Sequence, residues 1–149
     1  MLIKELREVQ EKLGYVPEKE LRQIAAKLSL PVYEVHGVAS FYPLFRLTPP
    51  PKVDIRVCTD MSCHLHYGDS LYMRVKDMVK TAGAEKTCEV RPVSCLGKCD
   101  GAPAVLINDH PYAGKAIRDL LDMIDSAIQG NEIPEEPFPG PDGPFKIDP

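Results

Sequence analysis

Long apolar runs and a surplus of positive charge are both missing from this sequence. No segment approaches the ~18 consecutive apolar residues that a membrane-spanning helix needs, so we expect no direct insertion into a bilayer. The formal net charge of −4 argues against a nucleic-acid partner, because nucleic-acid-binding domains usually carry a basic surplus. The first residues alternate charged with apolar side chains and lack a signal-peptide core. We therefore expect a cytoplasmic protein, soluble or on the cytosolic side of a membrane-bound complex.

Several motifs of catalytic sites are also absent. The sequence has no G-x-G-x-x-G fingerprint for a dinucleotide, no P-loop and no nucleophile beside a placed base. It also lacks the C-x-x-C motif of thioredoxin-type dithiols. The chain alone therefore offers no evident site for NADH, flavin or quinone, and we expect any redox chemistry to depend on a bound cofactor.

The chain does have enough apolar material for a packed core, and it has five cysteines. With 149 residues, 44% of them hydrophobic, it predicts one ordinary domain or a small domain with a helical appendage. An odd number of cysteines in a reducing compartment fits a disulfide framework poorly. Paired cysteines in such a compartment more often bind metal or take part in redox chemistry.

The first third of the chain predicts a helical domain over residues 1–47. Apolar spacing predicts three helices, at residues 2–13, from Pro17 through Leu28, and from Pro31 toward Phe45. Ser29 is a candidate N-cap for the third helix. Three consecutive prolines then break any helix and predict a stiff linker over residues 48–52.

After the linker the spacing of apolar residues changes, and residues 53–130 predict a small α/β domain. Strands are expected at residues 52–57, 86–92, 104–107 and around Tyr112, and helices at residues 68–82 and 115–129. The first two strands are joined by a helix and should run parallel. Residues 131–149 form a Pro/Gly-rich tail for which we predict no regular element.

Four of the five cysteines form two closely spaced pairs. Four residues separate Cys58 from Cys63, and three separate Cys95 from Cys99. Each pair lies where a predicted strand gives way to a loop. Two such loops at the same end of neighbouring strands would bring four thiolates together, which is the arrangement that a 2Fe-2S cluster needs, with two thiolates for each iron.

The loop of the second pair adds to the case for a cluster. Gly97 and Gly101 allow the backbone to come close and to turn amide groups toward sulfur, where N–H···S bonds stabilise negative charge. Lys98 lies inside the same loop and is a candidate for tuning the reduction potential through its charge.

The spacing alone leaves other metal sites open. A structural zinc site with four cysteines also spaces its ligands by two to four residues. A Rieske centre uses two histidines, and although His64 and His66 follow Cys63, the second cysteine pair has no matching histidine. We expect both histidines to be loop or surface residues, one of them a candidate hydrogen-bond donor to a cluster sulfur. Cys88, inside a predicted strand, is expected to be a buried thiol rather than a fifth ligand.

Three stretches of the sequence carry a family resemblance. They are GYVPEKELRQIAAKLSLPVYEVHGVASFYPLFRLTPPPK at residues 14–52, CTDMSC at residues 58–63 and SCLGKCDGAPAVLIND at residues 94–109. From about residue 2 to 130 the chain resembles the thioredoxin-like 2Fe-2S ferredoxins, in particular the 24-kDa-type subunits of NADH:quinone oxidoreductases. Related subunits occur in NAD-dependent hydrogenases and formate dehydrogenases.

This resemblance implies a thioredoxin-like 2Fe-2S domain behind a small three-helix domain. It also implies that all four paired cysteines, Cys58, Cys63, Cys95 and Cys99, ligate the cluster. The chain would then be an electron-transfer subunit of an NADH-dehydrogenase-type oxidoreductase, exchanging single electrons with a flavin on an NADH-binding partner subunit. The alternatives are the corresponding subunit of a soluble hydrogenase or formate dehydrogenase, and, remotely, a zinc-stapled interaction module.

Two positions in the second loop depart from the family pattern. Lys98 stands where a small residue is common in the family, so the resemblance predicts an altered reduction potential. Ser94 occupies a position that is often acidic in the family. The aromatic run Phe41-Tyr42-Pro43-Leu44-Phe45 predicts either core of the helical domain or a contact face for the partner subunit.

Overall fold

The computed structural model describes residues 1–134, so residues 135–149 of the predicted tail lie outside the described part of the chain. The helices are α1 (Leu2–Leu13), α2 (Glu18–Leu28), α3 (Val32–Phe41), α4 (Met61–Leu65), α5 (Gly68–Thr81) and α6 (Ile117–Ile128), with a 3-10 helix, η1 (Cys99–Gly101). The strands are β1 (Val53–Cys58), β2 (Cys88–Val93), β3 (Val105–Ile107) and β4 (His110–Tyr112). Within residues 1–134, none of the helices combines the length and the apolar character that crossing a bilayer requires.

The four strands form one sheet in the order β2-β1-β3-β4. The parallel pairing of β1 with β2 confirms the sequence prediction, and β3 and β4 add antiparallel. Cys58, the last residue of β1, lies opposite Val93, the last residue of β2. The carboxyl ends of β1 and β2 therefore lie side by side at one edge of the sheet, and each cysteine pair begins there.

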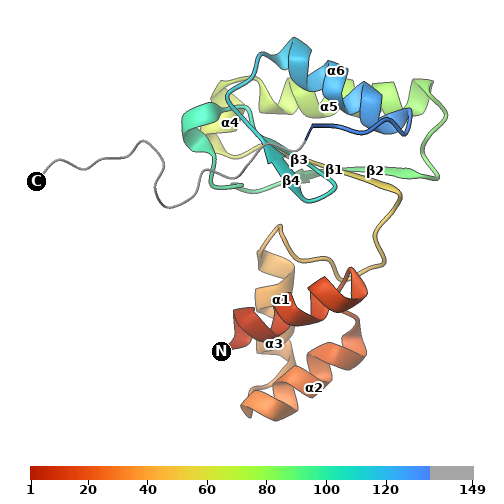
Figure 1. Ribbon diagram of the computed structural model, residues 1–149. Helices are drawn as coiled ribbons and strands as arrows, with labels where there is room; N and C mark the ends of the chain where they lie inside the picture. The colour runs from red at the N-terminus through yellow and green to blue at the C-terminus, as the bar shows by residue number, and fades with distance from the viewer. Residues whose placement is uncertain (135–149) are drawn as a thin grey trace, which may run out of the picture.

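Two large hydrophobic cores hold residues 1–134 together, and a third, small cluster contains Cys58, Cys63 and Ala104. Helices α5 and α6 cover one face of the sheet (Figure 1), where Ile55 and Val57 of β1 are fully buried against them. Helices α1, α2 and α3 pack around a second core that contains Leu6, Val16 and Leu21. Each core buries the apolar stripe that the sequence spacing predicts. The domain boundaries at residues 47 and 52 stay predictions.

Two expectations for the ends of helices were wrong. Helix α3 stops at Phe41 rather than running toward Phe45, because Tyr42 precedes a proline and is extended, with φ −82° and ψ 120°. Ser29 does not cap α3. It ends α2 in the left-handed conformation, with φ 53°, and Pro31 occupies the N-cap position of α3.

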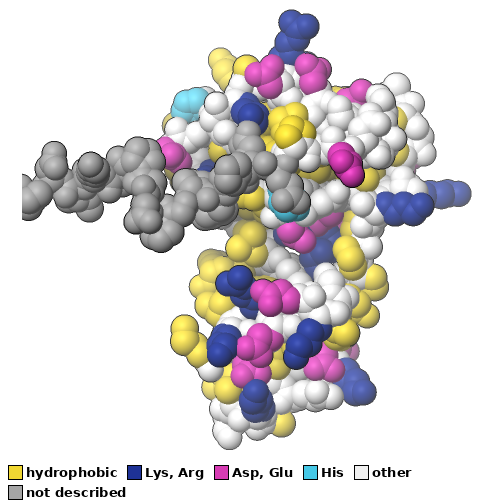
Figure 2. All heavy atoms as spheres, in the orientation of Figure 1, with side chains coloured by type: hydrophobic (Ala, Val, Ile, Leu, Met, Phe, Trp, Pro, Cys, Tyr) yellow, Lys and Arg dark blue, Asp and Glu magenta, His cyan; other side chains and the backbone are white. Residues whose placement is uncertain are grey.

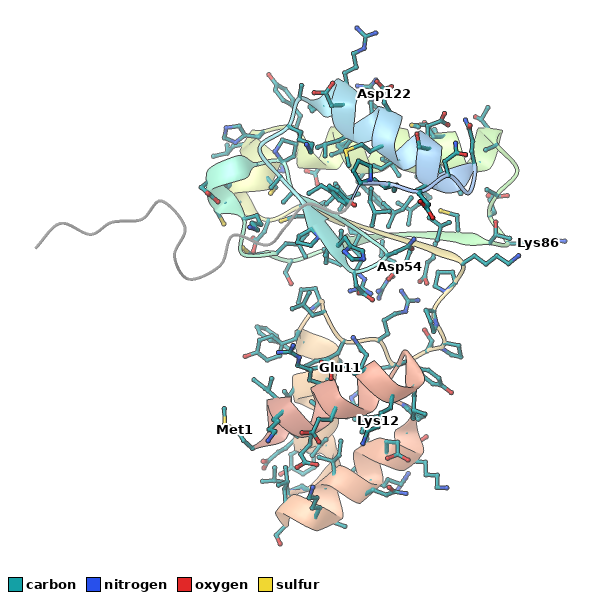
Figure 3. All side chains as sticks on the ribbon, in the orientation of Figure 1. Met1, Glu11, Lys12, Asp54, Lys86 and Asp122 are labelled. Carbon is teal, nitrogen blue, oxygen red and sulfur yellow. The ribbon has the colours of Figure 1, made fainter. Side chains whose placement is uncertain are left out.

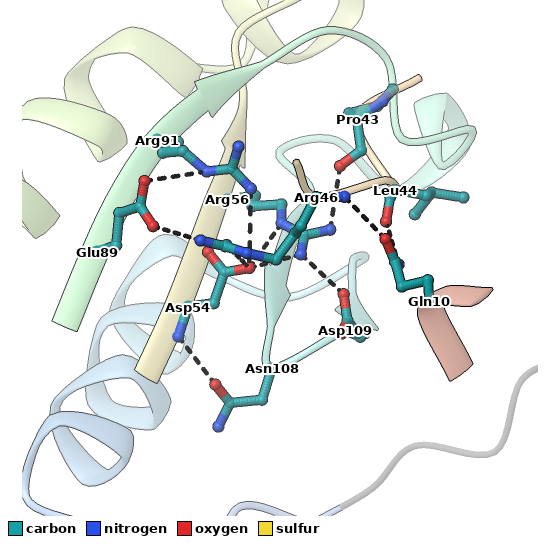
Figure 4. Close-up of polar contacts among 10 residues, drawn as sticks. All are labelled: Gln10, Pro43, Leu44, Arg46, Asp54, Arg56, Glu89, Arg91, Asn108 and Asp109. Atoms are coloured by element: carbon teal, nitrogen blue, oxygen red, sulfur yellow. Dashed lines mark hydrogen bonds and ion pairs between the residues drawn. The ribbon is translucent and has the colours of Figure 1, made fainter. Parts of the chain in front are cut away.

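The face of β1 that points away from α5 and α6 is also buried, which the sequence did not predict. Figure 3 shows Asp54 on the side of the sheet that faces the three N-terminal helices. The Arg56 guanidinium is fully buried, donates from Nε to Asp54 at 2.8 Å and donates from Nη1 to the Pro43 carbonyl at 3.0 Å. Arg46 forms ion pairs with Asp54 and Glu89 (Figure 4). A buried ionic cluster therefore joins the helices to the sheet.

The segment that carries Arg46 is itself fixed to the helices. The Arg46 N–H donates to Gln10 Oε1 at 2.8 Å, and Gln10 Nε2 donates to the Leu44 carbonyl at 2.8 Å. The Val16 N–H donates to the Arg46 carbonyl at 2.7 Å. The chain is thus anchored to the helices before it enters the proline-rich segment that leads to β1.

Candidate functional site

The four paired cysteines meet at one edge of the sheet, as the sequence predicts. Cys58 ends β1, and its N–H donates to the Ala104 carbonyl at 3.0 Å. Cys63 lies in α4, a five-residue helix that the apolar spacing did not predict, and Cys95 and Cys99 lie in the loop after β2. All four line a cavity of about 100 Å³, together with Asp60, Met61 and Ser62.

The four sulfurs are arranged as one buried and one exposed pair. Cys58 and Cys63 are each 2% exposed, whereas Cys95 and Cys99 lie at the surface with their Sγ atoms 3.3 Å apart. Burial raises the pKa of Cys63 to about 11, with a contribution from the neighbouring Cys58 thiol. Contact with Cys95 raises the pKa of Cys99. Crowded thiols resist ionisation, and a bound cation relieves that cost.

This donor set fits a two-iron cluster. Thiolates are the ligands that iron–sulfur clusters use, and two pairs around one cavity supply two for each iron. Among the described residues, no three His, Cys, Asp or Glu side chains are placed around a single metal ion. The two cysteine pairs around one cavity match the ligand arrangement of such a cluster, with two thiols for each iron.

The backbone of the second loop points a donor at sulfur. The Gly97 N–H donates to Cys95 Sγ at 3.4 Å, which confirms the predicted amide–sulfur contact for this glycine. Gly101 instead packs against the loop after β4. The Gly114 N–H donates to the Gly101 carbonyl at 2.6 Å, and a Cβ at Gly101 would lie 2.6 Å from the Gly114 nitrogen. Gly101 thus allows the loop after β4 to support the cysteine loop.

Comparison with known proteins agrees with this geometry. Residues 1–127 match the family model of the thioredoxin-like 2Fe-2S ferredoxins. The chain belongs to that family. This ferredoxin is 33% identical over 132 residues to an NADH-quinone oxidoreductase subunit of Aquifex aeolicus, covering 86% of this chain and 76% of the relative. It is 31% identical over 140 residues to NADH-quinone oxidoreductase subunit 2 of Thermus thermophilus, covering 91% of this chain and 77% of that protein.

A solved structure gives a second comparison. The crystal structure of NAD+-reducing NiFe hydrogenase in its H2-reduced state contains a similar region, with a TM-score of 0.57 and 25% sequence identity. The match covers 87% of this ferredoxin but only 22% of the hydrogenase chain. Family membership confirms the predicted fold class and the predicted 2Fe-2S cofactor, and it disfavours the zinc site that spacing alone left open.

The remaining candidate residues of this ferredoxin lie outside the cavity. His64 and His66 are both exposed. The Nδ1 atom of His64 contacts Asp69 Oδ2, and the Nδ1 atom of His66 lies 2.8 Å from the Ser62 carbonyl oxygen. Neither histidine lines the cavity. Both are therefore surface residues, as predicted, and neither is placed as a ligand.

The fifth cysteine and the loop lysine also have distinct surroundings. Cys88 is buried in the core between the sheet and helices α5 and α6, and burial raises its pKa to about 11, so it is a neutral thiol at physiological pH. It does not line the cavity. Lys98 lies in the loop between Cys95 and Cys99 and is half-buried.

Gly68, which sequence reasoning did not single out, has its backbone against both cysteines of the first pair. A Cβ at this position would lie 2.6 Å from the Cys58 carbonyl oxygen and 2.8 Å from that of Cys63. Real Cβ atoms do not approach backbone that closely, so a side chain would displace one carbonyl or both. The only signal in the sequence is a glycine at the start of a predicted helix. Glycine is modestly enriched near helix N-termini in general, so its place there does not reveal a packing contact.

We expect Gly68→Ala to lower the cluster content of the purified protein and to cost about 1–3 kcal/mol of stability, as overpacking does. Iron content per chain and the thermal midpoint measure both effects. Gly37→Ala in α3 is the matched control, because a Cβ there meets nothing within 4 Å. Equal iron content and equal midpoints in the two variants would show that the Gly68 contact does not constrain the site.

Proposed function

We propose that this ferredoxin is the 2Fe-2S electron-transfer subunit of an NADH-dehydrogenase-type complex, where it exchanges single electrons with a flavin on an NADH-binding partner subunit. The observation that carries the proposal is the convergence of Cys58, Cys63, Cys95 and Cys99 on one cavity. The similarity of the chain to NADH-quinone oxidoreductase subunits supports the proposed parent complex. We place the chain in the cytoplasm or on the cytosolic side of a membrane-bound complex.

Each cysteine pair has its own part in this proposal. When bound, the cluster supplies a one-electron centre and needs no substrate pocket. Cys58 and Cys63 would hold its inner side, fixed by the end of β1 and by α4. Cys95 and Cys99 would hold its outer side at the protein surface, where a partner can approach. The Gly97 N–H would stabilise negative charge on the Cys95 sulfur.

Exposed apolar side chains support a docking role for the aromatic run. Phe41 is 75% exposed, and Tyr42 and Leu44 are also exposed, whereas Phe45 packs against the helical core. Figure 2 shows hydrophobic side chains along the flanks of the helical region and at its junction with the sheet. Large exposed apolar groups gathered together typically mark protein contacts. We therefore assign this run to the partner interface rather than to the core alone.

Spectroscopy of the purified protein tests the cluster assignment. We expect a brown protein that binds two iron and two sulfide ions per chain and gives a 2Fe-2S EPR signal on reduction. A colourless protein with one zinc per chain would overturn the proposal. The subunits that co-purify with the native chain identify the parent complex.

A second candidate is the corresponding subunit of a soluble NAD-dependent hydrogenase or formate dehydrogenase, which the similarity to the NAD+-reducing hydrogenase favours. The two candidates use the same cysteines and differ in the assembly. Quinone-module proteins in the purified complex support the first candidate. A catalytic subunit that carries nickel or molybdenum supports the second.

Lys98 gives a test that depends on charge. We expect Lys98→Ala to lower the midpoint potential, because a nearby positive charge favours the reduced, more negative cluster. An EPR-monitored redox titration measures the shift. Lys86→Ala is the control, since Lys86 lies before β2, at the end of that strand away from Cys95 and Cys99 (Figure 3). Identical potentials for both variants and the wild type would show that the Lys98 charge does not reach the cluster.

A further inference from the structure

Two side chains of the first cysteine loop reach across to the second. Asp60 Oδ2 accepts a hydrogen bond from the Cys95 N–H at 3.3 Å, while its Oδ1 accepts one from the Met61 N–H at 3.0 Å. Ser62 Oγ donates to the Cys99 carbonyl at 3.0 Å. Asp60 and Ser62 both line the cavity that the four cysteines share. The backbone of each exposed cysteine is therefore tied to the loop that carries Cys63.

These contacts lie beyond the paired residues of strands β1 and β2. The ladder between β1 and β2 ends at the pair Cys58–Val93, and the Thr59 N–H still donates to the Val93 carbonyl at 3.0 Å. The strand pairing ends there, and Cys95 and Cys99 are exposed. Sulfur atoms that are to bind one cluster must keep a fixed separation, and the two side-chain contacts span the gap between the loops.

We propose that Asp60 and Ser62 are positioning residues that clasp the exposed pair, Cys95 and Cys99, against the buried pair, and that the Asp60 carboxylate also holds down the reduction potential of the bound cluster. The inference rests on the proposed function, because it takes the four cysteines as ligands. The electrostatic part follows from the place of Asp60 in the lining, since a carboxylate there opposes the addition of an electron. Its exposure to solvent screens part of this effect.

Three variants separate the clasp from the charge. Ser62→Ala removes one contact and leaves the charge in place. Asp60→Ala removes both the contact and the charge. Asp60→Asn removes the charge but keeps one oxygen, which can accept from only one of the two N–H groups. Asp122→Asn, an exposed acid on α6 far from the cysteines (Figure 3), is the control for loss of a negative charge elsewhere.

The first measurement is the rate at which the holoprotein loses its visible absorption to an iron chelator. We expect about tenfold faster loss in Asp60→Ala, the size of effect that one charge-assisted hydrogen bond produces, with Asp60→Asn between Asp60→Ala and the wild type. For Ser62→Ala we expect about fivefold faster loss, because its hydrogen bond joins two uncharged groups. The second measurement is the midpoint potential. It should rise in both Asp60 variants and stay unchanged in Ser62→Ala and Asp122→Asn.

The outcomes distinguish a failure of the clasp from a failure of the proposed function on which it rests. A wild-type protein without a 2Fe-2S spectrum overturns the proposed function itself. With a wild-type cluster present, release rates for Asp60→Ala and Ser62→Ala within a factor of about two of the wild type overturn the clasp. An unchanged potential in Asp60→Asn overturns the electrostatic part. Should Asp60→Ala fail to fold, Ser62→Ala and Asp60→Asn, which change fewer atoms, still decide both points.

Discussion

Replacing Cys95 or Cys99 with alanine is expected to abolish the visible absorption and the EPR signal of the cluster. Each replacement removes one of four thiolates, and the exposed pair has no other sulfur within its loop to take over. Groups that only hydrogen-bond to the ligands tune such a site by one or two orders of magnitude, whereas a lost ligand removes a metal–sulfur bond outright. Absorption spectra and iron content of the two purified variants measure the effect.

Cys88→Ala is the matched control for these replacements. It also removes a thiol, but this thiol is buried in the core between the sheet and helices α5 and α6 and does not line the cavity. We expect about 1 kcal/mol of lost stability from the small cavity it leaves, with an unchanged spectrum. If Cys95→Ala and Cys99→Ala kept the spectrum of Cys88→Ala, the exposed cysteines would not be ligands.

Removing the Arg56 guanidinium with Arg56→Met should produce the largest loss of stability of any single substitution discussed. Arg56 is fully buried, and its guanidinium contacts Asp54, Asp109 and the Pro43 carbonyl. Methionine fills much of the same volume, so the variant tests the charge rather than the packing. Removing one partner of a buried ion pair typically costs about 3–5 kcal/mol when the other charge stays buried. Arg46 still pairs with Asp54 in this variant, so we expect the lower end of that range. The midpoint of urea unfolding, followed on holoprotein, measures the cost.

An exposed ion pair gives the comparison for Arg56. Arg22 pairs with Glu18 one turn away on α2, and both side chains are mostly in solvent. Arg22→Ala should cost no more than about 0.5 kcal/mol. Unfolding midpoints for Arg56→Met and Arg22→Ala that agree within experimental error would mean that the ionic cluster does not hold the helices to the sheet.

Apolar spacing predicted most of the regular elements, because it reports how one side of an element is buried. Helix α1 occupies the predicted residues, the parallel pairing of β1 and β2 follows from the helix between them, and the cysteines converge because both strands end at one edge. Helix α4 was missed, since five residues are too few to display a period.

The burial of Asp54 and Arg56 was not predictable for a different reason. Both lie on the face of β1 opposite Ile55 and Val57, where the alternation of polar and apolar residues predicts exposure to solvent. Asp54 pairs with Arg46, which precedes the proline-rich segment, and Arg56 pairs with Asp109, which follows β3. These partners lie outside β1, so the alternation within that strand does not indicate the contacts. The same holds for Gly68, whose neighbours are backbone carbonyls rather than recognisable side chains.

The pairing of Cys58 with Val93 has a consequence for how the protein acquires its cofactor. Successive residues of a strand point to opposite faces, so a slip of one residue between β1 and β2 would turn Cys58 away from its three companions. An unfolded chain holds the two cysteine pairs more than thirty residues apart. We therefore expect cluster assembly to follow the formation of the sheet, and a substitution in the core at Ile55 or Val57 to lower iron loading without touching a ligand.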